Sequence, residues 1–89
     1  MQKLTLNTAS RGTIIQDEYD NEVYLIFEHC KKKKTIRCLN RKFNEVSIGT
    51  DWIDHYYIYD TIDMDSFVKR FCKNGQLSMI RKHNKRTNK

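Results

Sequence analysis

Most of the chain alternates apolar and polar residues with a period of two, which is the pattern of strands half-buried against a core. The segment 23–27 differs because it is apolar at every position, so we expect a central strand that is covered on both faces. The turn residues Asp20-Asn21 and the stretch 49–51 separate neighbouring segments. The segments that predict strands are residues 3–7, 13–16, 23–27, 35–39, 45–48 and 53–59.

A single segment has the spacing of an amphipathic helix. Its apolar stripe recurs at positions i, i+1, i+4 and i+5 and consists of Phe67, Val68, Phe71 and Cys72. Asp63 is a suitable N-cap, and Asp65 in the first turn complements the helix dipole. Ile62 can pack on Phe67, and Asn74-Gly75 supplies a left-handed stop. A further short strand or helical turn is expected at residues 77–80.

These elements predict an α+β fold: a small, mainly antiparallel β-sheet of about four to six strands with one C-terminal helix on one side. A half-open barrel satisfies the same pattern. The chain has 89 residues, so we expect one domain, which we place at residues 1–80. Residues 81–89 contain no apolar side chain and are predicted to form a disordered basic tail.

The formal net charge of +6 is distributed very unevenly along the chain. Acidic blocks without a base (13–28 and 45–65) alternate with basic blocks without an acid (29–44 and 66–89). The body, residues 1–80, therefore carries only +1, because five bases lie in the tail: Arg81, Lys82, Lys85, Arg86 and Lys89. The net charge thus points to a basic appendage on a nearly neutral domain.

The basic blocks favour a small, non-catalytic protein that binds nucleic acid, either DNA or RNA, or a nucleoprotein. A four-lysine turn between two strands can lie along a phosphate backbone, and a basic tail adds affinity through counterion release. Phosphate contacts position a protein without reading sequence. The residues predicted to contact nucleic acid are Lys31, Lys32, Lys33, Lys34, Arg37, Arg81, Lys82, Lys85 and Arg86.

The acidic blocks support an alternative, a protein inhibitor that binds a host enzyme or defence nuclease with a basic groove. Tyrosine is enriched in protein interfaces, and acidic side chains complement a basic partner. The residues of this predicted interface are Asp51, Trp52, Asp54, Tyr57 and Tyr59. Usage rich in Lys, Asn, Ile, Tyr and Phe and poor in Ala, Pro and Gly indicates an AT-rich gene, as in a phage or mobile element. The structural alternative for the aromatic residues, including Tyr24 and Phe27, is packing in the core or on half-buried strand faces.

Catalysis is not predicted, because no nucleophile elbow, phosphate-binding loop or paired-carboxylate metal signature occurs. His55 adjoins Asp54, but neighbouring residues of a strand point to opposite faces, so Asp54 cannot orient the imidazole. A small basic endoribonuclease is the enzymatic alternative. No Cys or His pair has the close spacing of a structural zinc site, so we expect no metal and no cofactor.

The chain contains no apolar run long enough to span a bilayer, and no secretory signal opens it. Cys30, Cys38 and Cys72 are odd in number and widely spaced, which is typical of reduced thiols. These features predict a cytoplasmic protein with no membrane contact.

Overall fold

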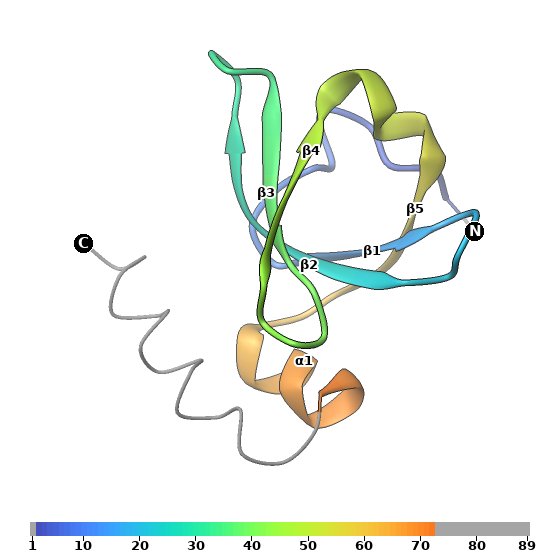
Figure 1. The fold of residues 1–89 in the computed structure, drawn as a ribbon, viewed down its shortest axis with the longest axis vertical. Helices are drawn as coiled ribbons and strands as arrows, with labels where there is room; N and C mark the ends of the chain where they lie inside the picture. Colours follow the sequence, from blue (N-terminus) through green and yellow to red (C-terminus); the bar gives the residue numbers. More distant parts are fainter. Residues whose placement is uncertain (1, 73–89) are drawn as a thin grey trace.

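The computed structural model describes residues 2–72, which form a five-stranded antiparallel sheet and one short α-helix (Figure 1). A 3₁₀ helix, η1 (Thr50–His55), precedes the last strand, and α1 (Met64–Phe71) follows that strand. The strands are β1 (Thr13–Asp17), β2 (Val23–Cys30), β3 (Thr35–Leu39), β4 (Glu45–Gly49) and β5 (Tyr56–Thr61). The predicted α+β class and the number of strands are confirmed.

The first four strands form a meander, and the fifth returns to the opposite side of the sheet. The strand order is β4-β3-β2-β1-β5, so β4 and β5 are the two edges. The sheet is open, and it curls so that η1 connects one edge to the other (Figure 1). This curl brings Glu18 of the β1–β2 turn against His55 of η1, although these two residues are more than thirty positions apart in the sequence.

The middle strand, β2, is buried on both faces, as the apolar segment 23–27 predicts. Leu25 is 2% exposed and the next residue, Ile26, is 0% exposed, although their side chains point to opposite faces. One face packs against α1 in a cluster formed by Ile14, Val23, Leu25, Phe27, Leu39, Phe43, Met64, Phe67 and Val68. The concave face holds a second cluster of Leu4, Ala9, Ile15, Ile26, Ile36, Cys38 and Ile48.

The helix begins where the sequence predicts. The Asp63 carboxylate accepts a hydrogen bond from the Ser66 amide at 2.8 Å, which is the expected N-cap contact. The same hydrogen bond holds the pKa of Asp63 below its ordinary value. The helix buries Met64, Phe67 and Val68 and ends at Phe71. The predicted stop at Asn74-Gly75 lies outside the described residues, as do the segment 77–80 and the tail.

The turn between β3 and β4 packs onto α1 through a residue with an unusual backbone. Phe43 has a φ of 62°, in the left-handed region that bulky residues rarely adopt. Its side chain is only 7% exposed, and its ring centroid lies 6.4 Å from that of Phe67. Burial of the aromatic ring against the helix therefore offsets the backbone strain.

Residues 3–7 do not form the predicted strand. Lys3 makes an isolated bridge to Tyr57, and the chain then turns. The Thr5 amide donates to Thr8 Oγ1 at 2.9 Å, and the Thr8 amide donates to Thr5 Oγ1 at 3.3 Å. These side chains offer the backbone local partners in place of a strand ladder. Before this turn, Leu4 is buried in the concave-face cluster, whereas Leu6 within the turn is 54% exposed.

The prediction of a strand over 53–59 is wrong for its first half. Residues 50–55 form η1, and β5 starts at Tyr56. The partner strand explains this limit, because the ladder with β1 begins at the pair Asp17 and Tyr56. Earlier residues have no strand beside them, so they close a helical turn instead.

Within residues 2–72, no helix is long and apolar enough to cross a membrane.

We expect Phe67→Ala to lower the free energy of unfolding by about 3–5 kcal/mol, as for other buried Phe truncations. The side chain is fully buried and joins the helix to the sheet. Urea denaturation measures the loss. Leu6→Ala is the control, because truncating a side chain that is 54% exposed should change the free energy by less than about 0.5 kcal/mol. Equal effects of the two substitutions would contradict this account of the core.

Candidate functional site

The described body has no net formal charge. Residues 2–72 contain eleven Lys or Arg and eleven Asp or Glu side chains, so the whole excess of +6 belongs to residues 73–89. Any electrostatic attraction between the body and a polyanion must therefore come from the way in which charges are grouped on its surface.

The arginines of the sheet and helix are paired with carboxylates. Arg37 contacts Glu28 at 3.0 Å and both oxygens of Glu45 at 2.9 Å. Arg41 contacts Glu22 at 2.9 Å, and Arg70 contacts the carboxylate of Asp60. These contacts raise the pKa of Arg37 and lower the pKa of Asp60. Neighbouring carboxylates thus compensate the charge of these three arginines.

The sequence predicts that Arg37 contacts nucleic acid together with the lysine turn, and the structure places it between carboxylates. Its guanidinium lies 4.9 Å from the centroid of the Phe27 ring and between two glutamates, Glu28 and Glu45. The charge of Arg37 is therefore compensated by carboxylates on the two neighbouring strands. The face of the hairpin that carries Arg37 is consequently not uniformly basic. The cationic part of the hairpin is its tip.

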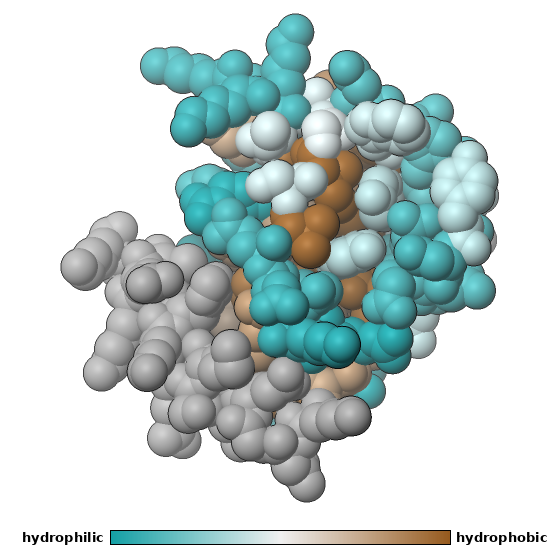
Figure 2. Space-filling view, in the orientation of Figure 1, coloured by the Kyte–Doolittle hydropathy of each residue, from teal (hydrophilic) through white to brown (hydrophobic). Residues whose placement is uncertain are grey.

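Lys31, Lys32, Lys33 and Lys34 form that tip, which we call the lysine tip. All four side chains are exposed, and among residues 2–72 none takes part in an ion pair. The hairpin projects from the body (Figure 1), and hydrophilic side chains extend from the same place in Figure 2. The Lys34 carbonyl accepts from the Thr50 amide at 3.0 Å, which ties the tip to the start of η1. The predicted lysine cluster is therefore compact and unneutralised.

The structure divides the predicted acidic and aromatic interface between two places. Asp51, Trp52 and Asp54 lie on η1, whereas Tyr57 and Tyr59 lie on the edge strand β5. The Lys3 ammonium lies 5.4 Å from the centre of the Tyr57 ring. Tyr59 contacts Phe71 edge to face, with ring centroids 5.4 Å apart. The five residues therefore lie on two elements, which Lys3 joins through the Asp54 carbonyl and the Tyr57 ring.

Trp52 instead belongs to a row of three rings that we call the ring row: Tyr19, His55 and Trp52. The centroid of the His55 ring lies 5.3 Å from Tyr19 and 5.1 Å from Trp52. Tyr19 is 74% exposed and Trp52 is 60% exposed, so the expectation that the aromatics pack in the core is wrong for Trp52. That expectation is confirmed for Phe27, which is 6% exposed. The curl of the sheet brings these rings together.

Sequence analysis missed Tyr19 as a functional candidate. It lies among Asp17, Glu18 and Asp20 in the β1–β2 turn, where no periodicity singles it out. The one available signal is a large aromatic residue in a turn that is otherwise polar.

His55 is held firmly at the centre of the ring row. Its Nδ1 lies 3.1 Å from Glu18 Oε1, and the Glu18 amide donates to the His55 carbonyl at 3.0 Å. The Asp54 side chain is not the partner of the imidazole, and the Asp54 carbonyl accepts from Lys3 Nζ at 3.0 Å. A carboxylate from a turn that is distant in sequence thus orients the ring, which the periodicity of the sequence could not indicate.

A groove of about 380 Å³ runs between β4 and the ring row, and we call it the β4 groove. Figure 2 shows hydrophobic side chains at the bottom of a hollow beside β4, with paler and hydrophilic side chains around it. Its lining consists of Asp17, Tyr19, Val46, Ser47, Ile48, Gly49, Trp52, His55 and Tyr56. Burial, followed by the nearby charge of Asp17, raises the pKa of Tyr56 to about 12.

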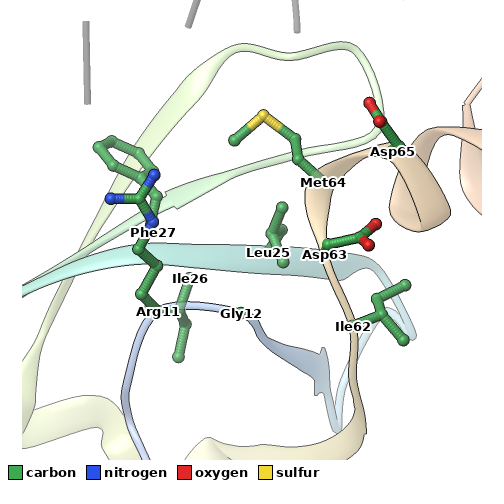
Figure 3. Close-up of a pocket in the computed structure, with 9 residues that line it drawn as sticks. All are labelled: Arg11, Gly12, Leu25, Ile26, Phe27, Ile62, Asp63, Met64 and Asp65. Carbon is green, nitrogen blue, oxygen red and sulfur yellow. The ribbon is translucent and has the colours of Figure 1, made fainter. Parts of the chain in front are cut away.

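A smaller cavity of about 270 Å³ lies between β2 and the start of α1 (Figure 3). Figure 3 shows the Arg11 guanidinium beside the Phe27 ring, across the cavity from Asp63 and Asp65. Asp63 is already engaged as the N-cap of α1. We therefore assign this cavity to the packing of the helix against the sheet.

The cysteines of the described part are free thiols, and no group of three His, Cys, Asp or Glu side chains in residues 2–72 is arranged to hold a metal ion. Cys38 is fully buried on the concave face, and desolvation raises the pKa of its thiol to about 12.

No protein-family model, curated protein or solved structure matches this chain.

We expect Cys38 to resist alkylation by iodoacetamide in the folded protein at pH 8. Raising a thiol pKa from 9.0 to about 12 lowers its thiolate fraction roughly a thousandfold, and burial restricts access further. Peptide mass spectrometry after a short pulse should show modified Cys38 only in urea. The partly exposed Cys30 serves as the internal control. Equal modification of both thiols in the folded protein would contradict the assignment.

Proposed function

We propose that this is a non-catalytic protein that binds nucleic acid or a nucleoprotein, and that its folded body contacts the phosphate backbone through the lysine tip. One observation supports this function above others. Arg37, Arg41 and Arg70 are each paired with carboxylates, whereas the four tip lysines are exposed and take part in no ion pair within residues 2–72. The largest group of adjacent lysines without an ion pair in residues 2–72 therefore lies at one projecting point.

The mechanism that follows is electrostatic. Each lysine that neutralises a phosphate releases condensed counterions, which drives association without reading the base sequence. The acidic β1–β2 turn repels phosphates, so an approaching strand meets the tip in preference to the ring row. In this proposal the tail residues Arg81, Lys82, Lys85 and Arg86 add phosphate contacts and raise the association rate. The protein would act in the cytoplasm, on DNA or RNA, without a cofactor or metal.

We expect binding to duplex DNA to weaken steeply with salt. About five phosphate contacts give a log–log slope of about −4 to −5, at about −0.9 for each contact. Changing all four tip lysines to Gln should flatten this slope, and deleting residues 81–89 should flatten it further. Fluorescence anisotropy of labelled duplexes between about 50 and 200 mM salt measures the slope.

The control is the double variant Lys42→Gln and Lys69→Gln, which removes exposed charge away from the tip and should keep more of the wild-type slope. No binding to DNA or RNA at about 50 mM salt would overturn the proposed function. So would a tip variant whose slope equals that of the wild-type protein.

A second candidate function is the capture and inhibition of a host enzyme or defence nuclease by the acidic and aromatic surface, as in a phage or mobile-element inhibitor. The observation that favours it is the exposure of Trp52, which is 60% accessible beside exposed Asp51 and Asp54. Large exposed aromatics at the edge of a groove are typical of protein interfaces.

For this second function we expect Trp52→Ala and Asp54→Lys to abolish co-purification of a partner from nuclease-treated host lysate. Deleting residues 81–89 should leave co-purification intact. Leu6→Ala is the control, because Leu6 is a 54% exposed apolar residue that does not belong to the predicted interface. Retention of the partner by both η1 variants would exclude this surface as the interface.

A further inference from the structure

We propose that the β4 groove binds an extended segment of a partner protein, and that a Lys or Arg side chain of this segment packs against the ring row. The inference rests on the second candidate function, to which it gives a binding site and a partner chemistry. It does not depend on the lysine tip, which lies at the β2–β3 turn.

The first support is the free edge of β4. Among residues 2–72, this strand pairs with β3 alone, over the five residue pairs from Thr35 and Gly49 to Leu39 and Glu45. Its other side therefore presents backbone N–H and C=O groups to the groove, whose lining includes residues 46–49. An extended segment can add to such an edge as a further strand, with main-chain hydrogen bonds supplying affinity.

The second support is the prearranged ring row. Tyr19 and Trp52 expose most of their surface, yet both rings contact His55, with centroids 5.3 and 5.1 Å away. Glu18 fixes His55 through a side-chain contact and a backbone hydrogen bond. The rings are thus positioned before a ligand arrives, which lowers the entropic cost of binding.

The third support is charge. The residues that line the groove include Asp17 and neither Lys nor Arg. Three further acidic residues, Glu18, Asp20 and Asp51, are sequence neighbours of the lining residues Tyr19 and Trp52. Two cationic groups lie near the groove: Lys3 is held by the Asp54 carbonyl and the Tyr57 ring, and the lysine tip is joined to the start of η1 through the Lys34 carbonyl and the Thr50 amide. Aromatic faces beside carboxylates attract an ammonium or guanidinium group and repel a phosphate. A cationic peptide therefore fits this groove better than a nucleic-acid backbone.

The fourth support is the size and polarity of the floor. Ile48 is 4% exposed, and Val46 and Tyr56 are partly buried against the same concave-face cluster. A volume of about 380 Å³ lies near the lower end of the range of about 300–1,000 Å³ for ligand pockets. The groove thus accommodates one or two side chains from an extended segment, with their neighbours pointing to solvent.

The test is selection of random decapeptides displayed on phage against the full-length protein, with the Trp52→Ala variant as the counter-selection. We expect the enriched peptides to share a Lys or Arg and to alternate apolar and polar residues. A labelled synthetic copy of an enriched peptide should bind at least tenfold more weakly to Trp52→Ala and to Tyr19→Ala. Replacing its cation by Gln should weaken binding similarly. Since Trp52 is the single tryptophan, its emission should shift when the peptide binds to wild-type protein.

Two matched variants separate this surface from others. Tyr59→Ala removes a 41% exposed aromatic residue elsewhere on β5 and should leave peptide affinity unchanged. The variant with all four tip lysines changed to Gln should bind the peptide at least as tightly as the wild-type protein, because it removes like charge near the start of η1. Failure of the nucleic-acid proposal is therefore recognised independently. Far-ultraviolet circular dichroism of Tyr19→Ala and Trp52→Ala checks that both remain folded.

Three results would overturn the inference: no peptide enriched over the Trp52→Ala counter-selection, enriched peptides without a cation, or equal affinity for Trp52→Ala. A shift of Trp52 emission by single-stranded oligothymidine, with displacement of the peptide, would also overturn it and assign the ring row to base stacking. If peptides fail but Trp52→Ala and Asp54→Lys still abolish partner capture, the second candidate function survives without this partner chemistry.

Discussion

The architecture depends on burying both faces of β2. Leu25 and Ile26 are neighbours in sequence and both are almost completely inaccessible, so each face of the strand needs its own cover. On one face the cover is α1, which contributes Phe67 and Val68. On the other face the sheet curls over its own concave side, and Leu4 from the N-terminal segment closes the cluster. Burial of apolar surface is the dominant favourable contribution to folding, so these two layers dictate the path of the remaining chain.

The candidate surfaces are consequences of that curl. The sheet stays open, and among residues 2–72 β4 has a partner strand on one side only. The helix η1 therefore connects this edge to β5 on the opposite side. The connection brings Trp52 and His55 to the β1–β2 turn, where Glu18 fixes the imidazole and Tyr19 extends the ring row. The core thus determines the position of the groove, although its lining is largely at the surface.

The charged side chains affect where the surface is positive or negative more than they affect the stability of the fold. Exposed ion pairs are generally worth less than about 1 kcal/mol, so the pairs of Arg37, Arg41 and Arg70 contribute little to the free energy of unfolding. Their effect is to compensate most cationic charge of the sheet and helix and to leave the lysine tip uncompensated. An anionic partner and a cationic partner are therefore directed to different places on one small body.

Local patterns predicted much of the fold. The alternating segments located β3 and β4, apolar runs located β1 and the central strand β2, and Asp63 marked the start of α1. These features depend on contacts within a few residues or on which face of a strand is buried. The prediction failed at residues 3–7 and 50–55 because a strand requires a partner, and neither segment has one along its full length. The lysine tip was visible in sequence because its members are consecutive.

The sequence by itself determined the class of fold, the uneven charge and the lysine tip, since each follows from composition or from short-range periodicity. Tertiary structure alone decided that Arg37 is compensated by Glu28 and Glu45, and that Tyr19 and Trp52 meet at His55. The physical reason is separation along the chain. Ion pairs and ring contacts act over a few ångströms in space, and which distant residues come that close depends on how the core curls the sheet.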